Sequence, residues 1–122
     1  MSPLQRTIRE LKDQGMVCAI TEKWNPHARI RQDLFGIIDL IALDPSRGVV
    51  GIQACGSDYA AHHKKLTGER AQNCINWLTT PGTVLEVWSW TKVLVKRGGK
   101  AKIWRPRVVD YTLADFIDPL QM

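Results

Sequence analysis

The chain has 122 residues, the size of one ordinary domain, and its 17 Lys and Arg against 12 Asp and Glu give it a net charge of +5. Its 44% apolar and 24% charged residues are typical of a globular protein, which excludes a disordered or collagen-like chain and a multidomain machine. Seven basic residues and no acidic residue fall within positions 91–107: Lys92, Lys96, Arg97, Lys100, Lys102, Arg105 and Arg107. The rest of the chain has 10 basic against 12 acidic residues, so this segment carries the entire positive excess. Such a local basic stripe is typical of proteins that bind nucleic-acid phosphates, and a solvated hairpin is the alternative.

The sequence predicts a soluble, cytoplasmic protein with no membrane partner. The N-terminal segment MSPLQRTIREL lacks the apolar run of a signal peptide, and no stretch of about 18 consecutive apolar residues occurs. The three cysteines, Cys18, Cys55 and Cys74, are odd in number and have no CxxC spacing. We therefore expect reduced thiols, without a disulfide framework or a structural zinc site.

The first half of the chain predicts, in order, a helix over residues 3–14, a strand over 16–21, a loop over 22–32, and a hairpin of strands over 37–43 and 49–55. Ser2 and Gln5 have the spacing of an N-cap and its capping-box partner, and Gly15 ends the helical pattern. The two hairpin strands are apolar runs, and the connecting DPSRG is a turn sequence.

The second half predicts one or two helices within residues 58–79, a strand over 83–90, a hairpin over 93–104 and a short helix near 113–117. Thr67 and Gly68 interrupt the helical pattern, and the pair Gly98-Gly99 predicts a two-residue hairpin turn. The short helix has Asp110 or Thr112 as its cap. The whole order predicts a single α/β or α+β domain with helices on the faces of a sheet, and the basic segment as an appended hairpin.

Two polar residues interrupt the apolar strands of the first hairpin: Asp39 in IIDLIAL and Gln53 in VVGIQAC. Burying a polar group without a partner costs several kcal/mol, about 2–7 for an amide, so these positions need an explanation. With the turn centred near Ser46, the two residues lie at almost equal distances from it and should be neighbours across the hairpin. Two adjacent oxygen donors suit a hard divalent cation such as Mg²⁺, or Mn²⁺ in its place.

A third ligand for such a cation has two candidates, Asp33 in RQDLFG and the backbone carbonyl of Ala54. The structural alternative is that Asp39 caps a loop or pairs with Arg29 or Arg31, and that Gln53 satisfies a sheet edge. In that case no metal is required.

The order helix, strand, Asp-bearing strand, turn and strand, with the segment RQDLFGIIDLIALDPSRGVVGIQACG, resembles the PD-(D/E)XK nuclease superfamily. Within it the chain is most similar to small phage-type resolvases related to archaeal Holliday junction resolvases and to the VRR-NUC type, over roughly residues 3–90. The resemblance implies a restriction-endonuclease-like core, a phage origin, and metal ligation by Asp39 and by Gln53, which stands at the acidic position of the motif. Ala54 is then the unspecified middle residue, and the first helix offers Gln5 or Glu10 as a further group facing the metal.

Cys55 stands where the superfamily places a lysine that stabilises charge on the phosphate or activates water. A neutral thiol does neither. The following helix offers Lys64 and Lys65 as replacements, and Lys23 is another candidate. The alternative for Lys64 and Lys65 is a solvated helix face.

The resemblance implies metal-assisted hydrolysis of DNA phosphodiesters, with Arg29, Arg31 and the basic hairpin on the DNA backbone. Contacts to phosphates do not read sequence, so we expect selectivity for branched structures, and a homodimer that matches the two-fold character of a junction. The alternatives are a catalytically impaired domain that only binds DNA or a nuclease partner, and an accessory protein without DNA affinity.

Other conspicuous side chains have simpler explanations. His62 and His63 are adjacent, so they project differently from a helix and are expected at the surface. The tryptophans of the later strands, Trp88, Trp90 and Trp104, fit a core or a dimer contact better than a base-stacking surface.

Overall fold

A computed structural model describes residues 1–118 and Leu120. The helices are α1 (Pro3–Asp13), α2 (Tyr59–Thr67), α3 (Ala71–Thr79) and the short 3₁₀ helix η1 (Leu113–Asp115). The strands are β1 (Val17–Ile20), β2 (Lys23–Asn25), β3 (Ile30–Gln32), β4 (Leu40–Asp44), β5 (Gly48–Cys55), β6 (Thr83–Leu94) and β7 (Lys102–Tyr111). The predicted mixture of helices and strands in an α/β arrangement is confirmed.

Five strands form one mixed sheet in the order β1-β4-β5-β6-β7. The predicted hairpin is β4–β5, with Leu40 opposite Ile52, and the α2–α3 crossover makes β6 parallel to β5. All other neighbours in this sheet are antiparallel. This arrangement brings the end of β5, the beginning of β4 and the beginning of α2 to the same end of the sheet.

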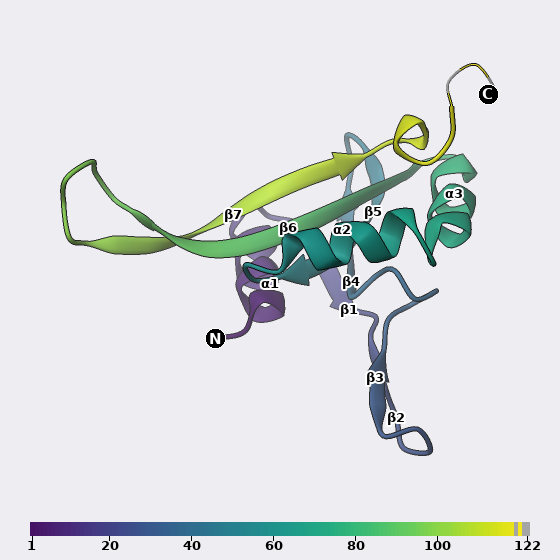
Figure 1. Cartoon of the computed structure of the whole chain (residues 1–122), viewed down its shortest axis with the longest axis horizontal. Coiled ribbons are helices and arrows are strands. Elements are labelled where there is room, and N and C mark those ends of the chain that lie inside the picture. Colours follow the sequence, from purple (N-terminus) through teal and green to yellow (C-terminus); the bar gives the residue numbers. More distant parts are fainter. Residues whose placement is uncertain (119, 121–122) are drawn as a thin grey trace.

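Helices cover both faces of the sheet (Figure 1). On one face, Leu11 of α1 packs on Leu40, Ile52 and Trp88. On the other face, the helices α2 and α3 and the segment around η1 pack on a second cluster: Ile37, Ile38, Cys55, Leu66, Cys74, Leu85, Val87 and Tyr111. The α/β/α layering follows from the period-2 alternation of β5, whose residues are buried on both sides.

The capping and turn residues identified in the sequence have their expected roles in the structure. Ser2 and Gln5 make the reciprocal hydrogen bonds of a capping box, and Gly15 takes the left-handed backbone (φ 83°) just after α1. Gly48 closes the β4–β5 turn with φ 115°, where a Cβ atom would lie 2.1 Å from the carbonyl oxygen of Gly82. Only glycine fits this position.

Three segments differ from the prediction. Residues 22–32 are not a loop, because they contain the two-stranded ribbon β2–β3, which projects from the body of the protein (Figure 1). The strand at 83–90 and the first strand of the hairpin at 93–104 are not separate, because both lie within the single strand β6 (Thr83–Leu94). The turn is also longer than two residues: Val95 N–H donates to the carbonyl oxygen of Ala101 across the loop. The remaining elements, including the break between α2 and α3, lie close to their predicted positions.

Candidate functional site

Asp39 and Gln53 lie side by side at the end of the sheet where β5 ends, as predicted. Asp39 immediately precedes β4, and its N–H donates to the carbonyl oxygen of Ile52 at 2.8 Å. The carboxylate of Asp39 in turn accepts the Ala54 N–H at 2.8 Å. Ala54 therefore contributes an N–H that orients Asp39, a role different from the carbonyl ligand considered from the sequence.

Three carboxylates converge here, because Asp33 and Glu22 reach Asp39 from other parts of the chain. Oxygen atoms of Glu22, Asp33 and Asp39 all lie within 4.8 Å of one another. The Glu22 N–H donates to the Asp39 carbonyl oxygen at 3.2 Å, which holds the start of the β2–β3 segment against the site. Asp33 is thus beside Asp39 as predicted, and Glu22 is an additional member.

Gln53 directs its two amide atoms to different partners. Nε2 donates to the Asp33 carboxylate and to the Ile37 carbonyl oxygen, each at 3.2 Å, and Oε1 lies 2.7 Å from Nδ1 of His62. The Gln53 oxygen that was expected to ligate a metal therefore faces His62 and not the carboxylates. Rotating the amide would place its oxygen against two acceptors, so this orientation is strongly preferred.

The pKa of Asp39 is raised from 3.8 to about 8. Burial is the largest cause, followed by the hydrogen bond and the negative charge of Asp33, with a smaller contribution from Glu22; the Ala54 N–H acts in the opposite direction. Asp39 is only 8% exposed. Near neutral pH the charged form of Asp39 is therefore disfavoured, and a proton or a cation at this position would offset its burial and the charge of Asp33.

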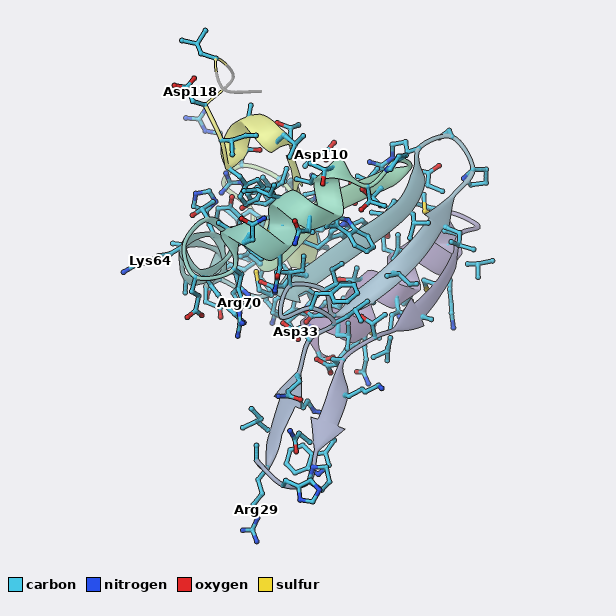
Figure 2. All side chains as sticks on the ribbon, turned by 90° about the vertical axis from the view of Figure 1, so that its right-hand side faces the viewer. Arg29, Asp33, Lys64, Arg70, Asp110 and Asp118 are labelled. Carbon is cyan, nitrogen blue, oxygen red and sulfur yellow. The ribbon has the colours of Figure 1, made fainter. Side chains whose placement is uncertain are left out.

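Of the candidate lysines, Lys65 reaches the site and Lys64 does not. Nζ of Lys65 lies 4.0 Å from a carboxylate oxygen of Asp33. Lys64, one residue earlier in α2, points away from the body of the protein (Figure 2). Lys23 lies on the exposed β2 strand opposite Gln32. Cys55 is buried, and burial raises the pKa of its thiol to about 11, so it is neutral at physiological pH.

A groove of about 440 Å³ gives access to the carboxylates. Its walls include the start of α1, Asp39, Ala54 and Arg31, whose guanidinium lies 3.5 Å from Glu22. Of the two α1 residues considered, Gln5 lines this groove while it also caps the helix, whereas Glu10 is bonded to Gln14 further along α1. Arg29 lies at the far tip of the β2–β3 ribbon (Figure 2).

The predicted basic segment is the part of β6 and β7 that extends past the end of β5, together with their connecting loop; we call residues 91–107 the basic ribbon. All seven of its basic residues are exposed: Lys92, Lys96, Arg97, Lys100, Lys102, Arg105 and Arg107. It leaves the sheet at the same end as the carboxylates, because β6 is parallel to β5 and continues beyond Cys55. The segment is therefore continuous with the sheet rather than an appendage.

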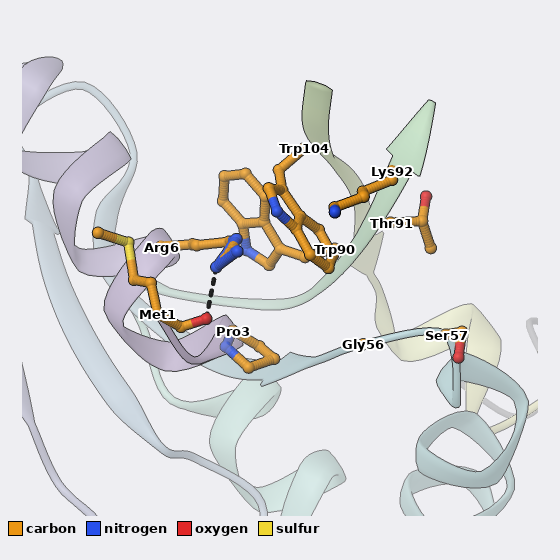
Figure 3. A pocket seen from close by; sticks show the side chains of 9 residues that line it. All are labelled: Met1, Pro3, Arg6, Gly56, Ser57, Trp90, Thr91, Lys92 and Trp104. Atoms are coloured by element: carbon orange, nitrogen blue, oxygen red, sulfur yellow. Dashed lines mark hydrogen bonds between the residues drawn. The ribbon is translucent and has the colours of Figure 1, made fainter. Parts of the chain in front are cut away.

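An aromatic and basic pocket of about 410 Å³ lies at the base of the basic ribbon, beside the start of α1 (Figure 3). Trp104 is 44% exposed, and the guanidinium of Arg6 lies 3.9 Å from its ring centre. Lys92, opposite Trp104 in the β6–β7 register, completes the positive lining. Trp88 and Trp90 are buried, as expected of core tryptophans, whereas Trp104 lies at the surface.

Sequence reasoning missed two groups at this end of the sheet. Glu22 was assigned to a loop without pattern, and only the fold brings it to Asp39. His62 was expected at the surface, but it is half-buried and bonded to Gln53. Its spacing of four residues from Asp58 on a helix was the available signal, because residues at that spacing share a face.

Comparison of the chain with known protein families, with curated proteins and with solved structures finds no match. Among residues 1–118 and 120, no helix has both the length and the apolar character needed to cross a bilayer.

Proposed function

We propose that this chain is a divalent-metal-dependent nuclease that hydrolyses phosphodiester bonds of DNA, with a core of the PD-(D/E)XK type. The observation that carries the proposal is the cluster of Glu22, Asp33 and Asp39 within 4.8 Å, with the Lys65 ammonium 4.0 Å from Asp33. Three carboxylates and one lysine at the end of a sheet are the groups that such a reaction requires.

The donor set fits Mg²⁺ or Mn²⁺. Hard cations prefer carboxylate oxygens, and burial and the neighbouring charges of Asp33 and Glu22 raise the pKa of Asp39, an effect that a bound cation would oppose. Glu22, Asp33 and Asp39 would hold the ion. When bound, the ion would polarise the phosphate and lower the pKa of a coordinated water molecule.

The other side chains position the carboxylates and add positive charge. The Ala54 N–H fixes the orientation of Asp39, and the Gln53 amide does the same for Asp33. Lys65 takes the role that the superfamily assigns to the lysine at the position of Cys55, because an ammonium beside the site stabilises negative charge that develops on the phosphate. Arg31 lines the groove and can bind a neighbouring phosphate.

The surface beside the site suits DNA with unpaired bases. The basic ribbon offers phosphate contacts that do not depend on sequence, and the Trp104 pocket offers an aromatic ring with two cations beside it. Both features favour a substrate with a branch, flap or single-stranded end.

We also propose that the protein acts as a homodimer, which matches the two-fold character of a junction. Light scattering of the free protein and of its junction complex tests this, and the mass of a single chain in both would contradict it.

A cleavage panel tests the function. Linear, single-stranded, flap and four-way DNA are incubated with Mg²⁺ or Mn²⁺ and with chelator, using the wild type and Asp39→Ala. We expect metal-dependent cutting that Asp39→Ala abolishes, while Asp44→Ala, which removes a carboxylate bonded to Ser46 and Arg47 at the other end of β4, leaves it unchanged. Lys65→Ala should lower kcat by about 10²–10³-fold, as loss of one charge-stabilising group does, and Lys64→Ala should not.

Two results would contradict the proposal. Cutting by Asp39→Ala at the wild-type rate would show that the carboxylate cluster is not the active site. Salt-sensitive DNA binding without cutting under any metal condition would instead favour the catalytically impaired DNA-binding domain, for which the neutral Cys55 is the supporting observation.

A further inference from the structure

A thiol, a carboxylate and an imidazole meet where β5 ends and α2 begins. The Cys55 Sγ, a carboxylate oxygen of Asp58 and a ring nitrogen of His62 all lie within 4.8 Å of one another. Cys55 is the last residue of β5, Asp58 is the N-cap of α2, and His62 follows Asp58 by four residues on the same face of the helix. None of the three belongs to the carboxylate cluster of Glu22, Asp33 and Asp39.

The hydrogen bonds of Gln53 determine which nitrogen of His62 faces Gln53 and which faces Asp58. Because Nε2 of Gln53 donates to Asp33 and to the Ile37 carbonyl oxygen, its Oε1 must accept a hydrogen bond, and Nδ1 of His62 is the donor at 2.7 Å. Metal-binding histidines show the same arrangement: one ring N–H donates to a fixed oxygen, and the other nitrogen presents its lone pair to the metal.

The other ring nitrogen of His62 contacts a carboxylate, with which a protonated ring would form an ion pair. Nε2 lies 3.1 Å from an oxygen of Asp58, and the other oxygen of Asp58 accepts the Gly56 N–H at 3.2 Å. An imidazole lone pair and a carboxylate oxygen at this distance repel each other unless a proton or a metal ion lies between them. In a tetrahedral zinc site, nitrogen and oxygen ligands are about 3.3 Å apart, close to the distance found here.

Charge and ligand type favour a transition metal over Mg²⁺. One thiolate and one carboxylate neutralise a divalent ion, which suits a half-buried position at the edge of the core. Sulfur and imidazole ligands select Zn²⁺ and similar borderline-soft ions, whereas Mg²⁺ requires oxygen ligands.

We propose that Cys55, Asp58 and His62 form a binding site for Zn²⁺ or a similar divalent transition-metal ion, with a fourth position open to water. Binding releases the thiol proton of Cys55 to solvent, and the thiolate becomes a ligand. The site does not depend on the proposed nuclease activity, because it uses different ligand atoms and a different class of metal.

Co²⁺ titration of the metal-free, reduced protein tests the site, because a cobalt–thiolate bond gives a charge-transfer absorption that oxygen ligands do not. We expect one saturable cobalt–thiolate signal that Zn²⁺ displaces and excess Mg²⁺ does not. Cys55→Ser should remove the thiolate band, and His62→Ala should weaken binding by about tenfold or more.

Matched controls are available within the chain. Cys74→Ser removes another buried thiol, which bonds to the Leu66 carbonyl oxygen, and His63→Ala removes the adjacent histidine, which bonds to Tyr111. Both should keep the signal. If Cys55→Ser fails to fold, Asp58→Asn serves instead, because this side chain is 63% exposed and its loss should weaken Co²⁺ binding without disturbing the core. Absence of a thiolate band in the wild type, or its persistence in Cys55→Ser, would overturn the proposal.

Discussion

Replacing Asp39 by Asn should change how the stability of the protein depends on pH. The substitution preserves the shape of the side chain. Its amide oxygen can still accept the Ala54 N–H, which lies 2.8 Å from the present carboxylate, and its amide nitrogen can donate to Asp33. What the change removes is the ionisable group whose charge the site does not accommodate.

The expected magnitude follows from the pKa of Asp39, which burial and Asp33 raise from 3.8 to about 8. The native state then binds more protons than the unfolded state between these two values, so the free energy of unfolding falls as pH rises through that window. At about 1.4 kcal/mol per pKa unit the shift corresponds to at most about 6 kcal/mol. Partial solvation of the site and its relaxation around the charge reduce this to about 2–3 kcal/mol.

Urea unfolding in the presence of chelator, at several pH values from about 5 to about 9, measures the effect. The wild type should lose stability over this range relative to Asp39→Asn, and the variant should be the more stable protein at the alkaline end. Mg²⁺ or Mn²⁺ should restore the wild type and leave the variant unaffected, since only a state that binds the ion gains from it.

Asp44→Asn is the control, because Arg47 and Ser46 lower the pKa of Asp44 to about 2 and keep it ionised throughout the range. Its loss should shift stability by the same amount at every pH. Equal pH dependence of the wild type and Asp39→Asn would refute the reasoning, since it would mean that the buried carboxylate is already compensated.

Two predictions concern the surface. Trp104→Ala should weaken binding of single-stranded DNA by about 1–3 kcal/mol, the value of one base–aromatic stack, with little effect on fully paired DNA; fluorescence anisotropy measures both, and an equal loss for the two substrates would argue against stacking. Replacing Lys96, Arg97 and Lys100 together by Gln should lower the salt dependence of DNA binding by up to about 2–3 in the slope of log K against log salt. An unchanged slope would show that the basic ribbon does not contact phosphates.

The sequence by itself located the two residues at the centre of the site. Asp39 and Gln53 interrupt apolar strands, and a short turn between paired strands makes their separation predictable from local spacing alone. Helix α1 was equally predictable from the sequence, because the residues that begin and end it lie within or next to the helix itself.

The projecting segments were harder to predict because solvent surrounds them. The strands of the β2–β3 ribbon are largely exposed, so they carry no alternation between apolar and polar residues. Thr91 and Lys92 appeared to separate a strand from a hairpin, yet both lie within β6, where the pairing with Arg105 and Trp104 of β7 tolerates polar side chains.

Only the tertiary structure decided which groups complete the site. Glu22 and Lys65 come from different elements and reach Asp33 and Asp39 through the order and direction of the strands, which local spacing does not encode. The choice of Lys65 over Lys64 depends on the rotation of α2 against the sheet, and Leu66, fully buried in the core, sets that rotation. Burial in the completed fold likewise raises the pKa of Asp39, because a carboxyl group loses its hydration only when distant segments cover it.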